Sequence, residues 1–297
     1  MSDDDVEFVD IRCAGRPVRI EHRWIAPRAQ PAAGPPQGGR PPAGEGAERA
    51  RGPTSQRPLL VFLHEGLGSL SMWKDYPEQL CEAADLRGLA YSRPGYGRST
   101  PREAGERWGT DFMHRQAFEL LPALLEALRV DQPPWLFGHS DGGSIALLYA
   151  SRFVTAGLVV VAPHITVEQY GLASIRKARN AFRTTDLRSR LARYHADPDS
   201  AFWGWNDIWL DPAFEAWTIE RELASIRCPL LAVQGEDDKY GTLEQIRGIA
   251  RRVAQTRVLV LPHCGHSPHR DRPEALTLEA AAFVHRHLKA TPQETAA

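Results

Sequence analysis

A serine flanked by small residues stands where a strand is expected to turn into a helix. The sequence Gly-His-Ser-Asp-Gly-Gly fills residues 138–143, directly after the apolar run 135–137 and before the helical pattern at 144–151. In a nucleophile elbow, small neighbours allow a tight, strained turn that projects the serine hydroxyl from the edge of the sheet. Because the flanking strand and helix are both indicated, we predict that Ser140 is a nucleophile.

A serine hydroxyl becomes an effective nucleophile when a base lies within hydrogen-bond reach and a third group orients that base. Carboxylates occur in the Gln-Gly-Glu-Asp-Asp stretch at 234–238, which follows the apolar run 230–233. Histidines occur at 262–269, after the apolar run 258–261. The order along the chain is serine, acid, histidine, which is one of the known orders for a triad that performs acyl transfer.

These motifs stand at the ends of short apolar runs that alternate with helical stretches. Such runs are typical of strands covered on both faces, and we place them at 59–63, 89–91, 135–137, 158–161, 230–233 and 258–261. We expect helices near 74–84, 111–129, 141–152, 242–253 and 273–289. Residues 6–12 and 17–25 predict two antiparallel strands around a turn at Ala14 and Gly15. The pattern predicts an α/β fold whose mostly parallel sheet has helices on both faces.

About 65 residues separate Pro163 from Pro229, which is too long for a simple crossover between strands. The stretch has helical periodicity and is dense in aromatic residues, which predicts a helical cap over the carboxyl edge of the sheet. Its rings either hold the cap helices together or wall an apolar pocket. Trp205 and Trp209, with His164 just after an apolar run, are our candidates for the pocket.

The segment 27–57 is rich in Pro, Gly, Ala, Arg and Gln and has almost no large apolar side chain. It cannot bury enough surface to offset the entropy of ordering, so we predict a flexible insertion. No aromatic or basic anchor pattern favours a proline-rich docking ligand. The expected organisation is a strand pair at 1–26, this insertion, a core at 58–163 and 227–290, a cap at 164–226 and a disordered tail at 291–297.

From about residue 58 to 289 the chain resembles the α/β-hydrolase superfamily, in its serine-nucleophile branch with a helical cap after strand six. The resemblance rests on the elbow and on four further motifs, which are Leu-His-Glu-Gly-Leu-Gly at 63–68, Ser-Arg-Pro-Gly-Tyr-Gly-Arg-Ser at 92–99, the turn at 235–238 and Gly-His-Ser at 265–267 followed by Pro273 and Glu274. It implies an eight-stranded, mostly parallel sheet and an activity like that of carboxylesterases or C–C bond hydrolases.

The family pattern also implies which residues complete the triad. It points to Asp238 as the acid, with Asp237 as the alternative, and to His266 as the base. His263 and His269 then flank the base. The three-residue spacing of these histidines could suggest a metal site, but no acidic or thiolate complement accompanies them on the loop.

A developing oxyanion needs two preorganised amide donors, which the family takes from the residue after the nucleophile and from the loop after strand three. These are Asp141 and one of Glu65, Gly66 and Leu67. Glu65 interrupts the simpler His-Gly pattern of the family, so the second donor among these three stays open. A carboxylate that pointed into this pocket would repel the oxyanion, so we expect the Glu65 side chain to turn away.

The charged side chains of Asp141 and of the arginines at 93 and 98 each allow a functional and a structural role. The carboxylate of Asp141 could raise the pKa of the catalytic imidazole and disfavour anionic substrates. It could equally form a buried hydrogen-bonded contact with the cap or with the loop at Glu65. Arg93 and Arg98 frame the Gly-rich turn after strand four, where structural ion pairing competes with binding of a substrate carboxylate.

Composition excludes several classes of partner. The 36 Lys and Arg residues nearly balance the 37 Asp and Glu residues, so the chain lacks the cationic surplus of a general nucleic-acid or anionic-membrane binder. The four cysteines, at positions 13, 81, 228 and 264, are far apart and fit reduced thiols. The acidic start and the lack of an apolar run of about 18 residues predict a cytoplasmic protein. We expect no cofactor and no metal, and we leave a homodimer open.

These observations predict a serine hydrolase that cleaves a small carboxylic ester with an apolar or aromatic acyl part through an acyl-enzyme. Ser140 argues against epoxide hydrolases and haloalkane dehalogenases of this fold, which use an aspartate nucleophile. C–C bond hydrolysis of a ring-cleavage product, thioester or lactone hydrolysis, and prolyl-peptide cleavage stay open. A hydrolase-fold receptor that binds a ligand without turnover is the alternative from another class.

Overall fold

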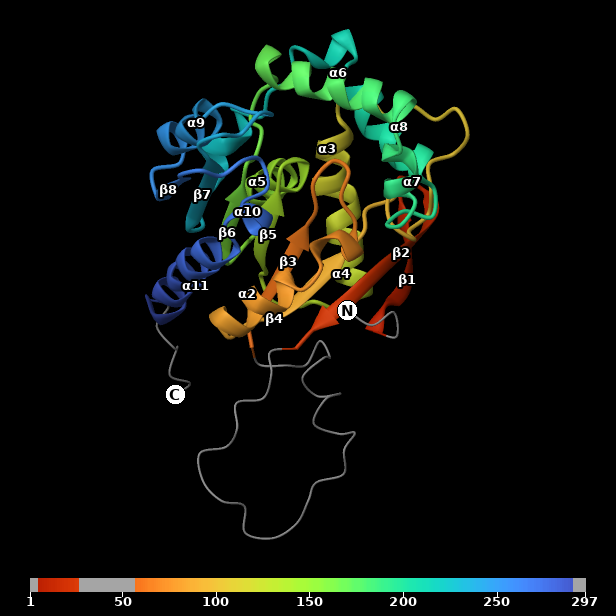
Figure 1. Ribbon diagram of the computed structural model, residues 1–297. Helices are drawn as coiled ribbons and strands as arrows, with labels where there is room; N and C mark the ends of the chain where they lie inside the picture. Colours follow the sequence, from red (N-terminus) through yellow and green to blue (C-terminus); the bar gives the residue numbers. More distant parts are fainter. Residues whose placement is uncertain (1–4, 27–56, 291–297) are drawn as a thin grey trace.

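Eight strands form one twisted sheet in the computed structural model, which describes residues 5–26 and 57–290 (Figure 1). The order across the sheet is β1-β2-β4-β3-β5-β6-β7-β8. β2 runs antiparallel to both β1 and β4, and every other neighbouring pair is parallel. The strands are β1 Glu7–Cys13, β2 Arg16–Ile25, β3 Leu59–Leu63, β4 Arg87–Tyr91, β5 Trp135–His139, β6 Gly157–Val161, β7 Leu230–Gly235 and β8 Thr256–Leu261.

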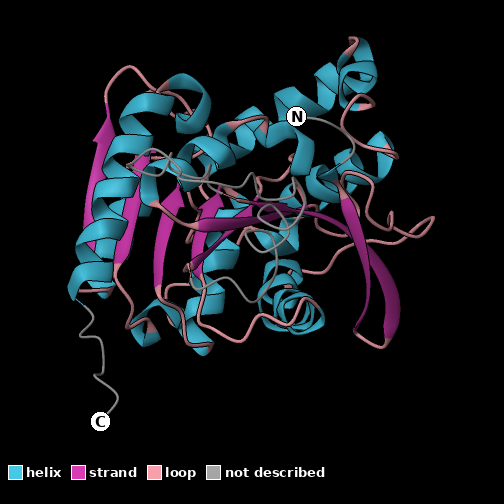
Figure 2. Cartoon of the chain, turned by 90° about the horizontal axis from the view of Figure 1, so that it is seen from below, coloured by secondary structure: helices cyan, strands magenta, loops and turns pink. Residues whose placement is uncertain are grey.

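The α/β fold predicted from the alternation is confirmed, and so is the eight-stranded sheet that the resemblance implied. The central strands are buried along their whole length because consecutive residues face two different cores. Leu136, for example, belongs to the core under α5 Asp141–Arg152, whereas Phe137 belongs to the core under α2 Tyr76–Ala84 and α11 Pro273–Ala290. Figure 2 shows the strands between these two helical layers.

The stretch 111–129 contains more than the single helix that we expected. It forms α3 Phe112–Arg115, a π-helical turn at Gln116–Leu120 and α4 Leu121–Ala127. Pro122 follows the wide turn, and its ring nitrogen has no hydrogen to donate to the preceding turn. The remaining helices are α6 Gln169–Thr184, α7 Leu187–Leu191, α8 Pro198–Trp209, α9 Glu244–Arg252 and α10 Pro268–Asp271, with short 3-10 turns at Leu70–Trp73, Pro212–Phe214 and Glu222–Ser225.

The long connection between β6 and β7, here called the β6–β7 segment, carries α6, α7 and α8 over one edge of the sheet (Figure 1). Aromatic stacking joins α6 to α8, because the rings of Phe182 and Phe202 lie 3.8 Å apart and nearly parallel. A bridge between Thr166 and Thr218 joins the two ends of the segment. The buried rings of the segment belong to the same hydrophobic core as the side chains under α5, above the carboxyl ends of the parallel strands.

Two predicted segments lie outside the described residues. They are the insertion at 27–57, apart from its last residue, and the tail at 291–297. Over the described ranges, no helix combines the length and the apolar character needed to cross a lipid bilayer.

Candidate active site

Ser140 occupies a strained turn between β5 and α5. Its backbone has φ 53° and ψ −119°, a conformation that a residue with a side chain rarely adopts. The neighbouring glycines make the turn sterically feasible. A Cβ on Gly142 would lie 2.0 Å from the carbonyl oxygen of Leu63, and one on Gly138 would lie 2.3 Å from that of Gly142. The small residues of the motif are thus required by close backbone packing.

The structure brings Ser140, His266 and Asp238 together at the carboxyl ends of β5, β7 and β8. The Ser140 Oγ atom lies 2.9 Å from Nε2 of His266. Nδ1 of the same ring lies 2.9 Å from each carboxylate oxygen of Asp238. Asp237, the alternative acid, is exposed, and its backbone amide donates to the carbonyl of Cys264. Asp238 is therefore the carboxylate that orients this imidazole.

Hydrogen bonds keep the buried Asp238 in its ionised form. Oδ1 accepts from the amide of Tyr240 at 2.8 Å, and Oδ2 accepts from Nε2 of Gln234 at 3.1 Å. Burial by itself raises the pKa of Asp238. The hydrogen bond and charge of His266, with the Tyr240 amide, outweigh burial and hold the pKa below its ordinary value. An ionised Asp238 can accept a hydrogen bond from Nδ1 of His266, and Nε2 of the same ring faces the Ser140 hydroxyl.

The loop after β3 is held beside the nucleophile through the carbonyl oxygen of Glu65. This oxygen accepts from the Gly68 amide at 3.0 Å, from Nδ1 of His64 at 2.7 Å and from Nη2 of Arg93 at 2.8 Å. The amides of Gly66, Leu67 and Asp141 donate to no protein acceptor within residues 5–26 and 57–290. These three amides are therefore the candidate donors for a bound oxygen atom.

The carboxylate of Glu65 contacts two donors on other elements. Oε2 lies 3.4 Å from Nδ1 of His139, and Oε1 lies 3.1 Å from Nη2 of Arg270. These contacts direct the carboxylate toward the loop after β8, and its side chain is 14% exposed. We had expected this side chain to turn away from the oxyanion position, and both contacts fit that orientation.

Asp141 makes a buried contact with the β6–β7 segment. Its Oδ1 accepts from Nε1 of Trp209 at 3.2 Å. Its Oδ2 lies 4.0 Å from Nη2 of Arg93, the guanidinium of which packs over the ring of Tyr96. Burial raises the pKa of Asp141, and the charge of Arg93 and the Trp209 hydrogen bond only partly oppose this effect. Of the two alternatives for Asp141, the geometry supports the buried contact.

Arg93 and Arg98 hold structural contacts. The Arg93 side chain is 1% exposed and lies between the Glu65 carbonyl and Asp141. Arg98 donates from Nε to the carboxylate of Glu21 at 3.0 Å. For both arginines, the geometry supports the structural role over binding of a substrate carboxylate.

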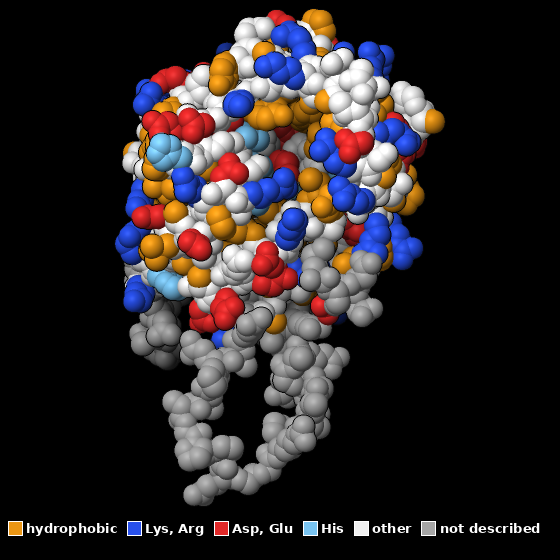
Figure 3. All heavy atoms as spheres, viewed as in Figure 1, with side chains coloured by type: hydrophobic (Ala, Val, Ile, Leu, Met, Phe, Trp, Pro, Cys, Tyr) orange, Lys and Arg blue, Asp and Glu red, His pale blue; other side chains and the backbone are white. Residues whose placement is uncertain are grey.

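The three predicted pocket residues all lie around the nucleophile. A Cβ on Gly66 would lie 2.2 Å from Cδ1 of Trp205, so this ring covers the loop after β3. The ring of His164 lies between those of Trp209 and His266, at centroid distances of 4.9 and 5.9 Å. Burial, with the nearby His266, lowers the pKa of His164 to about 3. Figure 3 shows a hollow on this face, below the helices of the β6–β7 segment, with hydrophobic side chains at its rim.

Sequence reasoning missed several neighbours of the triad. The Tyr240 ring lies 4.7 Å from that of His266, and the Tyr170 hydroxyl donates to the carbonyl of Asp238 at 3.2 Å. Gln234 binds the carboxylate of Asp238 from the end of β7. Tyr240 and Gln234 stand two and four residues from Asp238, but this spacing carries no distinctive chemical signal. His139 was visible inside the elbow motif, and only the structure shows its contacts.

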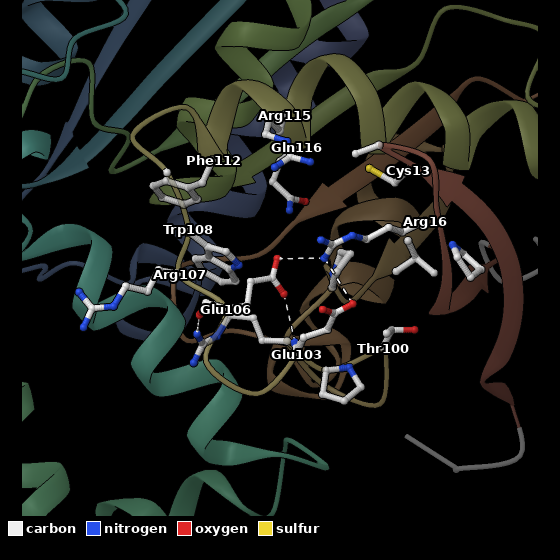
Figure 4. Close-up of a pocket in the computed structure, with 17 residues that line it drawn as sticks. Cys13, Arg16, Thr100, Glu103, Glu106, Arg107, Trp108, Phe112, Arg115 and Gln116 are labelled. Carbon is white, nitrogen blue, oxygen red and sulfur yellow. Dashed lines mark hydrogen bonds and ion pairs between the residues drawn. The ribbon is translucent and has the colours of Figure 1, made fainter.

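A separate cavity of about 510 Å³ lies between the β1–β2 turn, the loop after β4 and α3. Figure 4 shows Arg16 in this cavity, paired with Glu103 and Glu106. Trp108 stacks on Phe112 at its wall. None of the three triad residues lines this cavity. The aromatic side chains of the β6–β7 segment lie between it and the nucleophile, since Phe112 contacts Phe214, which contacts Trp209.

Comparisons with known proteins agree with this architecture. The 2-succinyl-6-hydroxy-2,4-cyclohexadiene-1-carboxylate synthase of Enterobacter sp. (strain 638) is 26% identical over 262 residues, covering 79% of this chain and 95% of that protein. A thermophilic esterase from Thermogutta terrifontis superposes with a TM-score of 0.66 at 17% identity, covering 95% of this chain and 99% of that one.

An enol-lactonase from Burkholderia xenovorans LB400 superposes with a TM-score of 0.67 at 18% identity, covering 94% of this chain and 100% of the other. At such identities the likeness shows the fold alone. Residues 60–280 match the sequence model described as the alpha/beta hydrolase family. This match spans most of the chain, which therefore belongs to the alpha/beta hydrolase family.

Proposed function

We propose that the protein is a serine hydrolase that cleaves a small carboxylic ester through an acyl-enzyme. The observation that carries this proposal is the continuous hydrogen-bonded line from Ser140 Oγ through His266 to Asp238, with 2.9 Å at each contact. Serine is a poor nucleophile unless a base takes its proton, and this geometry supplies the base and its orienting carboxylate.

The reaction proceeds in two steps. Ser140 Oγ attacks the ester carbonyl while Nε2 of His266 takes the serine proton and then gives it to the leaving alcohol. Backbone amides from Asp141 and from the loop at residues 65–67 stabilise the tetrahedral oxyanion. Water then attacks the acyl-enzyme with His266 again as the base, which releases the acid and restores Ser140.

The substrate is a small molecule whose acyl part is apolar or aromatic. Trp205, Trp209 and His164 supply a largely apolar wall, and burial keeps the imidazole of His164 uncharged at neutral pH. The buried carboxyl of Asp141 and the engagement of Arg93 with the Glu65 carbonyl disfavour an anionic acyl group. Neutral esters of short aliphatic and aromatic acids are therefore the first compounds to assay.

A Ser140→Ala variant tests the proposal. We expect wild-type protein to hydrolyse p-nitrophenyl esters and the variant to lose about 1,000-fold or more of kcat, because residual catalysis then comes from binding and oxyanion contacts alone. Circular dichroism should show an unchanged fold in the variant. If the folded variant hydrolysed the esters at the wild-type rate, the assignment of Ser140 would be wrong.

Hydrolysis of a C–C bond or a lactone is the second candidate, favoured by the aromatic wall that Trp205 and Trp209 form near Ser140. A structural neighbour is described as a serine hydrolase involved in carbazole degradation, and it superposes with a TM-score of 0.65. Assays of a 2-hydroxy-6-oxo dienoate and of an enol-lactone, run beside the ester panel, separate these activities by their kcat/KM values. Tight binding of a ligand with no turnover of any of them would instead indicate a receptor.

A further inference from the structure

His139 lies between two acceptor oxygens and joins two loops of the site. Its ring is buried at the C-terminal end of β5. Nε2 lies 2.7 Å from the backbone carbonyl oxygen of His266, and Nδ1 lies 3.4 Å from Oε2 of Glu65. A carbonyl and a carboxylate can only accept hydrogen bonds. A ring that donated to both oxygens through its two nitrogens would be an imidazolium.

Glu65 supplies the opposite charge for this imidazolium. Burial alone raises the pKa of Glu65, but the hydrogen bond and charge of His139 and the guanidinium of Arg270 outweigh it and hold the pKa well below its ordinary value. The group is therefore a carboxylate. Glu65 therefore presents a buried charge to Nδ1 of His139, and removal of the His139 ring would leave that charge without this partner.

The other titratable groups around His139 come from the loops after β6 and β8. The rings of His266 and His269 lie 5.1 and 4.8 Å from that of His139. Burial lowers the pKa of His269 well below its usual value, and burial also leaves His164 neutral. Arg270, on the far side of Glu65, adds the remaining charge. Glu65 is thus the carboxylate that faces His139.

We propose that His139 and Glu65 are positioning residues, in which the Glu65-bound imidazolium of His139 holds the backbone carbonyl of His266 and so fixes the base that serves Ser140. This inference rests on the proposed function. The His266 main chain is held by His139 while its side chain is held by Asp238. Because Glu65 belongs to the loop after β3, the pair also ties the position of the base to that of the oxyanion donors.

Three variants test the positioning role. His139→Phe keeps a ring but removes both donors, and we expect kcat for a p-nitrophenyl ester to fall roughly 10- to 100-fold with KM nearly unchanged, since a shift of about 1 Å in a catalytic group costs about 100-fold. His139→Gln can still donate to the carbonyl and should recover part of that loss. Glu65→Gln removes the counter-charge, and its kcat should lie between that of wild type and that of His139→Phe.

His269→Phe is the matched control. His269 is a buried histidine of the same cluster, but neither of its ring nitrogens has a hydrogen-bond partner among the described residues. Replacing it with another ring of similar shape removes no hydrogen bond from the loop after β8. We expect its kcat to stay within about twofold of wild type.

A spectroscopic measurement on wild-type protein reports the protonation of His139 directly and requires only that the His139→Gln variant used for assignment is folded. Long-range ¹H–¹⁵N spectra, with the His139 signals identified by their loss in His139→Gln, should show both ring nitrogens protonated at the pH of the assay. A singly protonated His139 ring would overturn the proposal. So would folded His139→Phe and His139→Gln variants that both keep the wild-type kcat.

These outcomes are distinct from failure of the proposed function. Wild-type protein and His139→Phe could react with a fluorophosphonate at Ser140 at the same rate. This result would contradict the positioning role alone. Wild-type protein that neither reacts nor turns over esters would remove the serine hydrolase assignment, and the spectra of His139 would still report the ion pair.

Discussion

At the scale of single residues, burial sets the charge states near Ser140. The carboxyl of Asp238 has hydrogen bonds that overcome burial, so its pKa is lowered, whereas Asp141 has fewer compensating partners and its pKa is raised. His164 has aromatic neighbours, and burial lowers its pKa to about 3. The hydrogen bonds around Asp238 therefore keep a charge next to His266, whereas burial disfavours charge on Asp141 and His164.

The neutral state of His164 predicts a dependence of stability on pH. The unfolded chain binds a proton at His164 near pH 6.5, while the folded chain does so only near pH 3. Between these values protonation favours unfolding, so stability is lost as the pH falls below about 6.5. Because of His164, we expect the free energy of unfolding of wild-type protein to fall by about 2 kcal/mol from pH 7 to pH 5.

Urea unfolding of wild type and His164→Phe at both pH values measures this contribution. The variant should lose less stability than wild type on acidification, because the ionisable ring is gone while an aromatic ring still packs against Trp209 and His266. Equal losses in the two proteins would mean that His164 is not a buried neutral imidazole.

At the scale of elements, the β6–β7 segment and the loop after β3 contact each other directly. Gly66 leaves room for the ring of Trp205, and Trp209 donates to Asp141 at the start of α5. The segment thus contacts two residues whose backbone amides are proposed to bind the oxyanion. Rigid contact here is what preorganised oxyanion stabilisation requires.

Gly66→Ala tests this contact. The new Cβ would lie 2.2 Å from Cδ1 of Trp205, so either the loop or the ring must move. We expect kcat/KM for a good ester to fall about 10-fold or more, since misplaced donors stabilise the transition state less well. In a Trp205→Ala background the same change should cost much less, and a double-mutant cycle measures the difference. Additive losses would contradict the contact.

Phe182→Ala tests what holds the β6–β7 segment together. The Phe182 ring is buried and stacks on Phe202 at 3.8 Å, away from the triad contacts. We expect the variant to lose about 3 kcal/mol of stability in urea unfolding. Leu278→Ala on α11, where the side chain is 70% exposed, is the control and should change stability by less than about 0.5 kcal/mol. Equal effects would show that the stacked pair does not stabilise the segment.

At the scale of the whole molecule, the sequence predicts the sheet well because its strands are buried on both faces. The apolar runs at 59–63 and 230–233 lie in β3 and β7, since strands between two helical layers leave an uninterrupted apolar signal. The same alternation predicts which loops meet at the carboxyl edge. Ser140, Asp238 and His266 could therefore be proposed as neighbours, and the structure places them in contact.

Contacts made through the backbone and between side chains of different elements could not be predicted. The role of the Glu65 carbonyl as an acceptor for three donors depends on how the loop after β3 folds back. The contacts of His139 depend on where a backbone carbonyl 127 positions away comes to lie. The π-helical turn before Pro122 likewise arises from a local conflict that helical periodicity does not reveal.

The central claim is that Ser140 carries the acyl group during turnover, and mass spectrometry of protein quenched while it hydrolyses a p-nitrophenyl ester tests it most directly. We predict that the peptide containing Ser140 gains the mass of the acyl group in wild-type protein. Slower deacylation in a His266→Ala variant should not move the adduct to another residue. Continued turnover with the acyl group on a different side chain, or an undiminished rate in protein that lacks the Ser140 hydroxyl, would contradict the account.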